Sequence, residues 1–544
     1  MKTKVTDDLQ DRSFFEPTFP GEGFAFNYLP SRIDRNALYA LNKVFDPQLV
    51  AEVRTKYHRA KLTIGDLRSD LMGYSSFKGS RKHTTLYYSV MESVERDLFP
   101  EQDMKIIPWT HGSVACHPEL PRQKSPGIPL KSQGYANKGE ALDDPEVLRG
   151  IRKQWYSIEA GREVVLPDVA CYARAQICTR EKNKVRATWG YPLTVFLTEA
   201  QYFYPLIQYI KASKSRLMAY GLEMGNGGMQ YLDTMVKSHK GGNIIIGDWS
   251  RFDKTVPAWL IRDAFRMLSR HIDWTQVETV KSGSKWPVKE QASKARWKKI
   301  VSYFIDTPIQ LSNGERWIKR GGVPSGSCFT NLIDTIVNAI VMRYLVAEQT
   351  GELPLDDVYL GDDSVCLTTK PINLEVLSEQ AKEQFYMVFN PDKSYQTSNP
   401  DNVHFLGYYN SRGDPRKPVD TIIASSIYPE RPTRDKFETL TRLVGQAYSC
   451  FRPTDAMKFF KAARIMMEEC VELEDSEVET YIRTHPHQFK YLSTLGIKVI
   501  KGITFPQFKD WEIVNCTVPR SPRKKWEFRK HDLDELRNYE YKWN

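Results

Sequence analysis

Short apolar runs separated by turn signals dominate the middle of the chain, and two of them adjoin acidic residues. The nearly continuous apolar run from Asn243 to Ile246 predicts a buried strand that delivers Asp248 to its end. Apolar residues on both sides of the segment from Gly361 to Asp363 predict a strand, a tight turn and a second strand. The pattern therefore places carboxylates at strand ends.

Helical spacing appears after Gly321 and again toward the C-terminus. Apolar residues recur at three- and four-residue intervals from Phe329 to Tyr344, after a Gly/Pro/Ser loop, and this predicts a helix packed under the sheet. After Asp420 the pattern is helical again, with Thr454 as the expected N-cap and an apolar stripe from Met457 to Met467. The stripe indicates core packing.

Length and composition narrow the class of protein without fixing its function. A chain of 544 residues exceeds a single hydrophobic core, so we expect two or more packed lobes. A net charge of +10, from 77 basic and 67 acidic residues, suits a polyanionic partner. The start of the chain lacks an apolar signal region, and no apolar stretch has the length of a membrane span. The 8 cysteines show no ligand spacing, so neither zinc nor disulfides are expected.

The candidate catalytic groups are four carboxylates, Asp248, Asp253, Asp362 and Asp363. Strand ends that meet would gather hard oxygen ligands, which divalent cations prefer. Phosphoryl transfer uses two such cations about 3.5–4 Å apart to activate the attacking oxygen and stabilise the leaving one. An isolated Gly-Asp-Asp turn is usually only turn chemistry. The motifs around these carboxylates are what favour a catalytic role over simple turn chemistry.

These motifs run through the middle of the chain in a fixed order. The segments DWSRFD, GVPSGSCFTNLIDT and GDDS resemble motifs A, B and C of viral RNA-dependent RNA polymerases, and motif B is most similar to the picobirnavirus and partitivirus group of double-stranded RNA viruses. SPG at Ser125 is similar to motif G, and RAQICTREKNKVRATWGYP from Arg174 to motif F. NPDKSYQ around Lys393 is similar to motif D, and VHFLGYYNSR from Val403 to motif E.

The resemblance implies an α+β fold of the right-hand polymerase type. Its antiparallel palm sheet would pack on helices, and its N-terminal extension and thumb would be largely helical. The implied domains are an N-terminal extension linking fingers and thumb at 1–115, fingers with motifs G and F at 116–242, palm with motif A at 243–265, a fingers insertion at 266–308, palm with motifs B to E at 309–420, and thumb with the C-terminal tail at 421–544.

The resemblance also implies residue roles. Asp248, Asp362 and Asp363 would ligate Mg²⁺, with Mn²⁺ as a substitute, and Lys393 would protonate the leaving pyrophosphate. The implied nucleotide-binding residues are Arg174, Arg180, Lys184, Arg186, Asp253, Ser325, Thr330, Asp334 and Asn338. The implied RNA-binding residues are Ser125, Pro126, Gly127 and Gly326.

Recognition of ribose requires groups that face its 2′-hydroxyl, which both donates and accepts hydrogen bonds. Asp253, Ser325 and Thr330 are suited to it. Related polymerases commonly carry Asn nine residues after the motif B serine, where this chain has Asp334, and its next Asn is Asn338. Two alternatives stay open: Asp334 accepts directly from the hydroxyl, or it orients Asp253 through Thr330.

The expected activity is template-directed RNA synthesis that replicates and transcribes a viral double-stranded RNA genome. The implied partners are an RNA template and product, ribonucleoside triphosphates and a viral capsid protein, with no membrane. We expect a monomer in the virion interior and the host cytoplasm. A reverse transcriptase would carry an aromatic-x-Asp-Asp turn and a bulky group at Asp253, whereas a non-enzymatic, capsid-internal RNA-binding protein would not require the carboxylates.

The C-terminal tail carries basic residues interleaved with aromatics, among them Arg520, Arg523, Lys524 and Trp526. Such a segment can track a nucleic-acid strand and stack on its bases. Two alternatives stay open: the tail folds back toward the template or product channel and restrains RNA entry, or it is a solvated, charged terminus.

Overall fold

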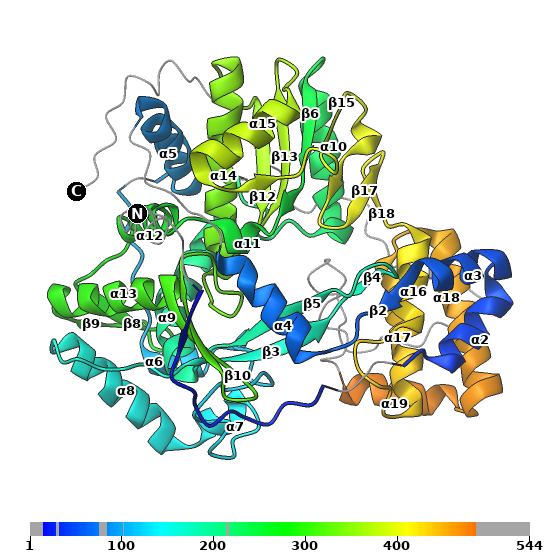
Figure 1. Ribbon diagram of the computed structural model, residues 1–544, viewed down its shortest axis with the longest axis horizontal. Helices are drawn as coiled ribbons and strands as arrows, with labels where there is room; N and C mark the ends of the chain where they lie inside the picture. The colour runs from blue at the N-terminus through cyan, green and yellow to red at the C-terminus, as the bar shows by residue number, and fades with distance from the viewer. Residues whose placement is uncertain (1–14, 29–31, 76–83, 102, 214–216, 486–544) are drawn as a thin grey trace, which may run out of the picture.

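The computed structural model describes residues 15–28, 32–75, 84–101, 103–213 and 217–485 (Figure 1). The basic C-terminal tail lies outside these ranges, so its predicted path stays a prediction. The strands form several mostly antiparallel sheets that pack with helices, which confirms the α+β class. Within the described ranges, no helix is both long and apolar enough to span a membrane.

A four-stranded antiparallel sheet forms the upper part of the molecule in Figure 1. Its strand order is β12 (Asp356–Leu360), β13 (Asp363–Thr368), β6 (Asn243–Gly247) and β15 (Tyr395–Thr397). Because both faces of the sheet are covered, the residues of β6 form a nearly continuous apolar run. Ile245 packs in the core with helix α14, whereas Ile244 and Ile246 pack in the core with α10 (Met229–Ser238).

Helix α14 (Thr330–Thr350) confirms the helix predicted after the Gly/Pro/Ser loop. Phe329 precedes its first turn, and Gly351 ends it with a φ of 79°, in the left-handed region that glycine enters without strain. Nearly every position from Leu332 to Ala347 is buried, because α14 packs against β12 and against α5 (Thr85–Leu98) and α12 (Ala258–Ser269). The helix is the central support of this sheet.

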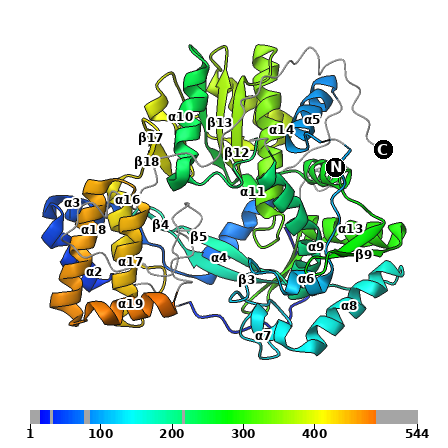
Figure 2. The same cartoon turned by 180° about the vertical axis from the view of Figure 1, so that it is seen from behind.

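A second, five-stranded sheet lies below the first in Figure 1. Its strand order is β1 (Phe15–Thr18), β11 (Arg316–Arg320), β10 (Asp306–Leu311), β3 (Val169–Ala175) and β5 (Val185–Gly190). The elements around it include α4 (Ile64–Leu71), α6 (His111–Ala115), α7 (Lys138–Asp143), α8 (Pro145–Glu159), α9 (Leu193–Ala212), α13 (Glu290–Ile305) and the hairpin of β8 (Gln276–Thr279) and β9 (Ser284–Pro287). Figures 1 and 2 both place α8, α13 and the hairpin at the outer edge.

A third, helical part combines the two ends of the described chain. Helices α2 (Arg35–Val44) and α3 (Pro47–Lys56) pack with α16 (Val419–Ile427), α17 (Lys436–Ser449) and α18 (Pro453–Ile465), as Figure 2 shows from behind. Strand β2 (Tyr57–Arg59) then pairs with β4 (Ile177–Thr179). The remaining elements are α19 (Asp475–Thr484), α11 (Phe252–Thr255), α15 (Leu374–Gln380), the pair β7 (Trp249–Ser250) and β14 (Val388–Phe389), and the small sheet β16 (His404–Phe405), β17 (Tyr408–Ser411) and β18 (Asp414–Arg416).

The predicted cap of α18 is wrong, although its apolar stripe is right. Arg452 is the N-cap, and Pro453 occupies the first helical position, where a missing N–H costs nothing. Thr454 therefore lies inside the first turn. Met457 and Met467 at the two ends of the predicted stripe are both buried in the core.

An ion-pair network buried beneath the upper sheet joins three elements. The fully buried guanidinium of Arg343 on α14 donates to both carboxylate oxygens of Asp357 on β12, at 2.7 and 2.8 Å. It also donates to Asp97 and Ser93 of α5, at 2.6 and 3.0 Å. Each charge has partners of the opposite sign, which is the condition under which a buried ion is tolerated.

Removing one partner from this network should be strongly destabilising. Asp357→Asn leaves Arg343 buried with less opposite charge, and we expect a loss of about 3–5 kcal/mol of unfolding free energy. Glu146→Gln removes the exposed pair with Arg149 and should cost less than about 1 kcal/mol. Urea denaturation and thermal melting compare the two; equal, small shifts would contradict the structural role of the network.

Candidate active site

Strand register brings the predicted carboxylates together. Ser364 on β13 is opposite Gly247 on β6, so the antiparallel register puts Asp248 beside Asp363 at the end of the sheet. Leu360 is opposite Asp363, which leaves Gly361 and Asp362 as a two-residue turn. Gly361 has a φ of 61°, the conformation that the first position of such a turn requires. The sequence prediction of a strand, turn and strand is confirmed.

The carboxylates at this sheet end disfavour one another's charge. Burial raises the pKa of Asp362, and the neighbouring Asp253 and Asp248 raise it further. Burial, then Asp362 and Asp248, raise the pKa of Asp363 to about 6. Burial also raises the pKa of Asp253, with Asp70 adding to the effect. The acidic cluster therefore lacks the positive charge that would let all its members ionise.

Lysine and arginine side chains approach the cluster from the second sheet and from the turn after β14. Burial lowers the pKa of Lys184, and the nearby cations Arg186 and Lys393 lower it further, whereas Asp248 opposes them. Arg186 in turn favours the charged form of Asp362. Lys184, Arg186 and the exposed Lys393 thus share one electrostatic neighbourhood with the acidic cluster.

Two cations predicted to bind nucleotide are engaged elsewhere. Arg174 makes a two-pronged ion pair with Glu430, with Nε–Oε1 and Nη2–Oε2 distances of 2.7 and 2.9 Å. Arg180 donates to the backbone carbonyl of Arg54 at 2.9 and 2.6 Å. The motif F segment folds into β3, β4 and β5, so its cations separate.

Asp248 is held by residues that the sequence interpretation did not select. Its backbone N–H donates to the hydroxyl of Ser394 at 2.8 Å, and its carbonyl accepts from the N–H of Asn390 at 2.9 Å. Both partners belong to the segment that also carries Lys393. The turn after β14 thereby fixes the end of β6.

Asp253 lies beside the loop that precedes α14. Ser325 donates to its Oδ2 at 3.3 Å, and the buried Tyr74 lies 3.4 Å from the same oxygen while donating to the carbonyl of Val323 at 2.9 Å. Thr330 donates instead to the carbonyls of Pro324 and Ser327, at 2.5 and 3.0 Å. Tyr74 belongs to none of the motifs, so no sequence pattern indicated its role.

Asp334 and Asn338, one helical turn apart, have different surroundings. Asp334 is buried, its Oδ1 has no hydrogen-bond partner among the described residues, and burial together with Asp253 and Asp362 raises its pKa well above the ordinary value. Asn338 is fully buried and donates to the carbonyls of Gly361 and Asp363 at 3.0 and 3.3 Å. Asn338 thus supports the turn from behind, and its predicted contact with nucleotide is not supported by this geometry.

A buried glutamate on α9 holds the loop before α14. Glu199 Oε2 accepts from the hydroxyl of Ser327 at 2.7 Å and from the N–H of Cys328 at 2.9 Å. Burial raises the pKa of Glu199 to about 8. Gly326, predicted to bind RNA, packs so closely on β5 that a Cβ would lie 2.2 Å from the carbonyl oxygen of Trp189. The sequence signal for Glu199 was a lone acid within an apolar helix.

The predicted motif G residues lie in a loop between α6 and α7. Ser125 shares a hydrogen bond of 2.9 Å with the hydroxyl of Tyr172, and the carbonyl of Pro126 accepts from the N–H of Leu193 at 2.9 Å. Gly127 has a φ of 72°, and a Cβ there would lie 2.6 Å from the carbonyl oxygen of Tyr191. Pro126 and Gly127 are buried, so of the three only Ser125 retains partial exposure.

The acidic cluster has the donors for divalent cations but not a closed shell. In the part of the chain that the structure describes, no group of three or more His, Cys, Asp or Glu side chains is gathered tightly enough to hold a metal alone. Mg²⁺ does not need one, because it binds through one or two carboxylates, phosphate oxygens and water. Asp248, Asp362 and Asp363, which the strand register gathers at one sheet end, fit such a cation.

Comparison with known proteins points to the same chemistry as the arrangement of the site. The family model for viral RNA-dependent RNA polymerase matches residues 60–445. The chain is 28% identical over 450 residues to the RNA-directed RNA polymerase of Cryptosporidium parvum virus 1, covering 76% of this chain and 80% of that one. It is also 28% identical over 320 residues to the RNA-directed RNA polymerase of Atkinsonella hypoxylon virus, covering 51% and 47%.

A sheet end with crowded carboxylates beside basic residues is the arrangement that phosphoryl transfer requires. The chain belongs to the viral RNA-dependent RNA polymerase family. It is therefore an RNA-directed RNA polymerase, a nucleotidyltransferase that serves viral RNA replication, as the sequence predicted.

The raised pKa of Glu199 predicts a pH dependence of stability. A carboxyl that shifts from 4.5 to about 8 on folding contributes stability that is complete below pH 4.5 and is lost as pH rises through 8. Glu199→Gln cannot ionise, so its melting temperature should fall less than that of the wild type over this range. Glu146→Gln, at an exposed position, should keep the wild-type slope. Parallel curves for Glu199→Gln and the wild type would refute the assignment.

Proposed function

We propose that Asp248 and Asp362 hold the divalent cations of nucleotidyl transfer, with Asp363 completing the second site. The observation that supports this most is the register of β6 and β13, which puts Asp248 beside Asp363 at the foot of the Gly361–Asp362 turn. When bound, Mg²⁺ or Mn²⁺ would stabilise the charge that develops on the transferring phosphoryl group. The carboxylates position the cations, and the tight turn keeps Asp362 at the tip.

Lys184 and Arg186 are proposed to bind the triphosphate. Their electrostatic interactions with Asp248, Asp362 and Lys393 support this, since the phosphates must lie between the cations and the metal-binding carboxylates. Lys393 is exposed at the same site and is proposed as the proton donor to the leaving pyrophosphate. Arg174 and Arg180 are assigned to structure instead, since their guanidinium groups join β3 and β4 to other segments.

Asp253, Ser325 and Asp334 are proposed to select ribose. Ser325 and Asp253 already share a hydrogen bond, so a 2′-hydroxyl that reaches them meets both a donor and an acceptor. Asp334 is proposed to interact with Asp253 by charge, because Asp253 is among the causes that raise the pKa of Asp334. Thr330 is assigned to the loop, since its hydroxyl donates to two loop carbonyls.

The three parts of the molecule are proposed to be palm, fingers and thumb. The four-stranded sheet with α14 corresponds to the palm, the five-stranded sheet and its helices to the fingers, and α16 to α19 to the thumb. Helices α2 and α3 pack on the thumb while β2 pairs with β4, which supports a bridging N-terminal extension. Ser125 is proposed to face RNA from the fingers.

We also propose the partners of the protein and its location. The chain would act as a monomer on RNA template, RNA product and ribonucleoside triphosphates, in the virion interior and in the host cytoplasm. A viral capsid protein is the further partner, and the genome is double-stranded RNA. The resemblance of motif B to the picobirnavirus and partitivirus group supports these points.

Asp362→Ala should abolish synthesis while leaving RNA binding nearly intact. Binding rests on phosphate contacts, whereas chemistry rests on the cation site, and its loss should cost at least about a thousandfold in rate. Incorporation of labelled ribonucleotides on a defined template, and RNA affinity by filter binding, measure the two effects. Asp103→Asn, at an exposed position outside the motifs, is the control. Near wild-type synthesis by Asp362→Ala would remove the metal assignment.

Asp253→Ala should reduce the preference for ribonucleotides more than it reduces divalent-cation affinity. Asp253 faces Ser325, whereas the proposed cation ligands sit at the strand ends. Single-nucleotide incorporation of ribo- and deoxyribonucleoside triphosphates at one template position measures the preference. Asp334→Asn, measured in the same way, tests the contribution of Asp334. Unchanged discrimination in an active Asp253→Ala enzyme would return the role to Ser325 or Asp334.

A further inference from the structure

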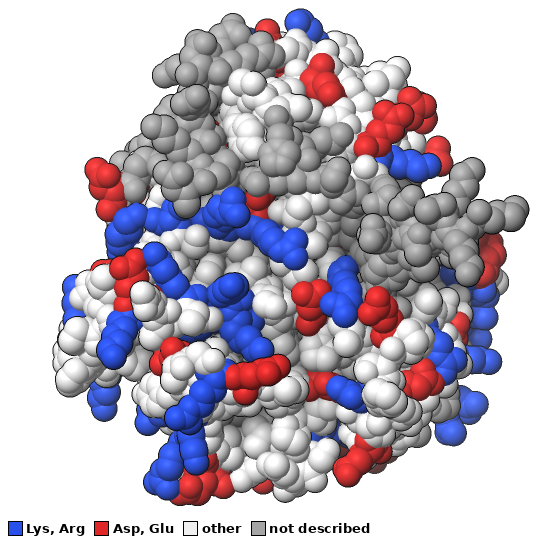
Figure 3. Space-filling model, turned by 60° about the vertical axis from the view of Figure 1, so that its left-hand side comes forward, with Lys and Arg blue, Asp and Glu red and all other residues white. Residues whose placement is uncertain are grey.

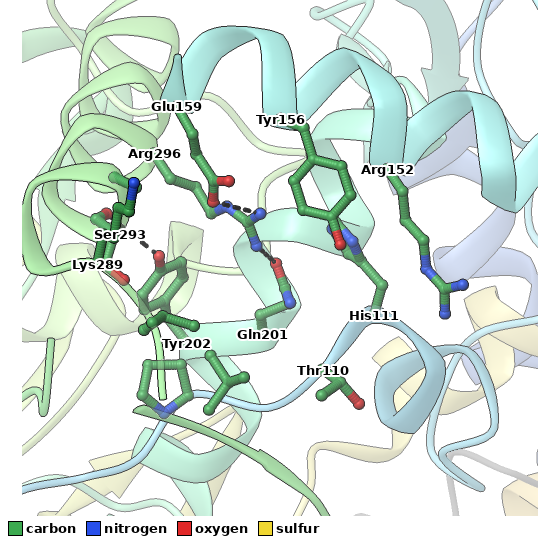
Figure 4. Close-up of a pocket in the computed structure, with 14 residues that line it drawn as sticks. Thr110, His111, Arg152, Tyr156, Glu159, Gln201, Tyr202, Lys289, Ser293 and Arg296 are labelled. Atoms are coloured by element: carbon green, nitrogen blue, oxygen red, sulfur yellow. Dashed lines mark hydrogen bonds and ion pairs between the residues drawn. The ribbon is translucent and has the colours of Figure 1, made fainter. Parts of the chain in front are cut away.

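A cavity of about 370 Å³ lies at the outer edge of the five-stranded part, between α8, α9 and α13 (Figure 4). Its size falls within the range of small-molecule sites, about 300–1,000 Å³. The residues around it include Arg152, Tyr156 and Glu159 of α8 and Arg296 of α13. None of the residues assigned above to catalysis or nucleotide binding lines it. Figures 1 and 2 place α8 and α13 away from the end of the four-stranded sheet, whereas α9 runs inward from the cavity toward the loop before α14.

The charge of the cavity favours an anion. Arg152, Lys289 and Arg296 line it with a single carboxylate, Glu159. Glu159 is already paired with Arg296 at 2.6 Å, while Arg152 and Lys289 are exposed and have no acidic partner in the described ranges. Figure 3 views the molecule from this side and shows Lys and Arg side chains gathered over one half of the face. Two cations are therefore available to a ligand.

The inner wall holds an unsatisfied donor. Arg296 is 8% exposed, and its two terminal nitrogens bind Glu159 and Gln201, with Nη1 donating to Gln201 Oε1 at 2.6 Å. Its Nε has no hydrogen-bond partner among the described residues. A buried N–H without an acceptor costs free energy, so a ligand acceptor or a water at this point would stabilise the wall. Figure 4 shows the guanidinium standing between Glu159 and Gln201.

The cavity also presents a neutral acceptor. The hydroxyl of Thr198 donates to the carbonyl of Thr194 at 2.9 Å, so it accepts from Nε2 of His111, 2.8 Å away. His111 therefore carries its proton on Nε2 and keeps Nδ1 as an acceptor. Burial and the nearby Arg296 and Arg152 lower the pKa of His111 well below its ordinary value, so the ring stays neutral. A neutral acceptor suits the amino or hydroxyl groups of a nucleoside.

An exposed aromatic ring also lines the cavity. Tyr156 is 59% exposed and extends into the cavity above His111 (Figure 4). The hairpin that contributes Val277 to the lining also carries Trp286, which is 55% exposed. Exposed aromatics beside cations are the combination that stacks on bases and binds phosphates. An inorganic anion or an acidic peptide would use the cations but not the rings.

We infer that the cavity between α8, α9 and α13 is a second nucleotide site, which binds a ribonucleoside phosphate through Arg152, Lys289, Tyr156 and His111. The ligand is a free nucleotide or the terminal nucleotide of a single RNA strand, since both carry this chemistry and an RNA polymerase meets both. The site lies outside the proposed catalytic centre, so binding there holds the ligand without exposing it to nucleotidyl transfer.

Equilibrium dialysis of labelled ATP in EDTA tests the inference, because chelation weakens metal-dependent binding at the catalytic centre. The wild type should retain one ATP, and the double variant Arg152→Ala, Tyr156→Ala should bind it at least about tenfold more weakly, as the loss of a base stack and a phosphate contact implies. The matched control is Arg149→Ala, Lys153→Ala, two exposed α8 positions outside the lining. Melting temperatures verify that both double variants fold.

Competitors identify the source of the ligand. Stronger competition by a short 5′-phosphorylated RNA than by ATP would assign the site to an RNA end, and equal competition would assign it to free nucleotide. Equal competition by inorganic phosphate would overturn the nucleoside assignment. Equal ATP affinity in the wild type and the Arg152→Ala, Tyr156→Ala variant would overturn the site itself. Asp362→Ala should keep this ATP binding, which separates the inference from the proposed catalytic residues.

Primer extension supplies the remaining control. The Arg152→Ala, Tyr156→Ala variant should extend a preformed primer–template at the wild-type rate within about twofold, because both residues lie on α8, at the outer edge of the molecule. A parallel loss of extension and of ATP binding would show that the dialysis had reported the catalytic centre, and would overturn the inference.

Discussion

The repulsion among carboxylates at the end of the four-stranded sheet is the constraint on which the rest of the site depends. Asp248, Asp362 and Asp363 are brought together by strand pairing, and burial together with the neighbouring carboxylates raises the pKa of Asp362 and of Asp363. Asp253 and Asp334 add to the same cluster. A fold that forces these groups together is stable as an ionised cluster only when cations enter it. Lysine and arginine side chains near the cluster supply part of this positive charge, and we propose that divalent metal supplies the rest.

The elements around the cluster hold it against this repulsion. Asn338 donates to the backbone of the Gly361–Asp363 turn, and Arg343, five residues further along α14, fixes β12 through Asp357. Asp70 pairs with Lys254 after Asp253 and accepts from the N–H of Ala187 beside Arg186, which ties the acidic and basic segments together. Buried polar contacts of this kind set distances more rigidly than apolar packing does, because an unmade hydrogen bond is costly. The positions of the charges are thus fixed before substrate arrives.

Features with a local signal were predictable from sequence, and features made by distant contacts were not. The run before Asp248 and the turn at Gly361 identify themselves by apolar content and glycine, and the helix after Phe329 by its spacing. The partner of Arg174 could not be predicted, because Glu430 lies in a remote segment with no motif. Tyr74 was missed for the same reason. Glu199 is visible as a lone acid within an apolar helix, but the loop that it holds is far away in sequence, so its role could not be predicted. Ordinary residues acquire such roles only through tertiary packing.

The most direct test of the account is the effect of Mg²⁺ on stability. A ligand that binds the folded state raises the melting temperature with its concentration. If the carboxylate cluster holds the cation, Mg²⁺ should raise the melting temperature of the wild-type protein, and Asp248→Ala or Asp362→Ala should remove most of that response. The exposed-site variant Asp103→Asn should respond as the wild type does. An undiminished Mg²⁺ response in both cluster variants would contradict the account.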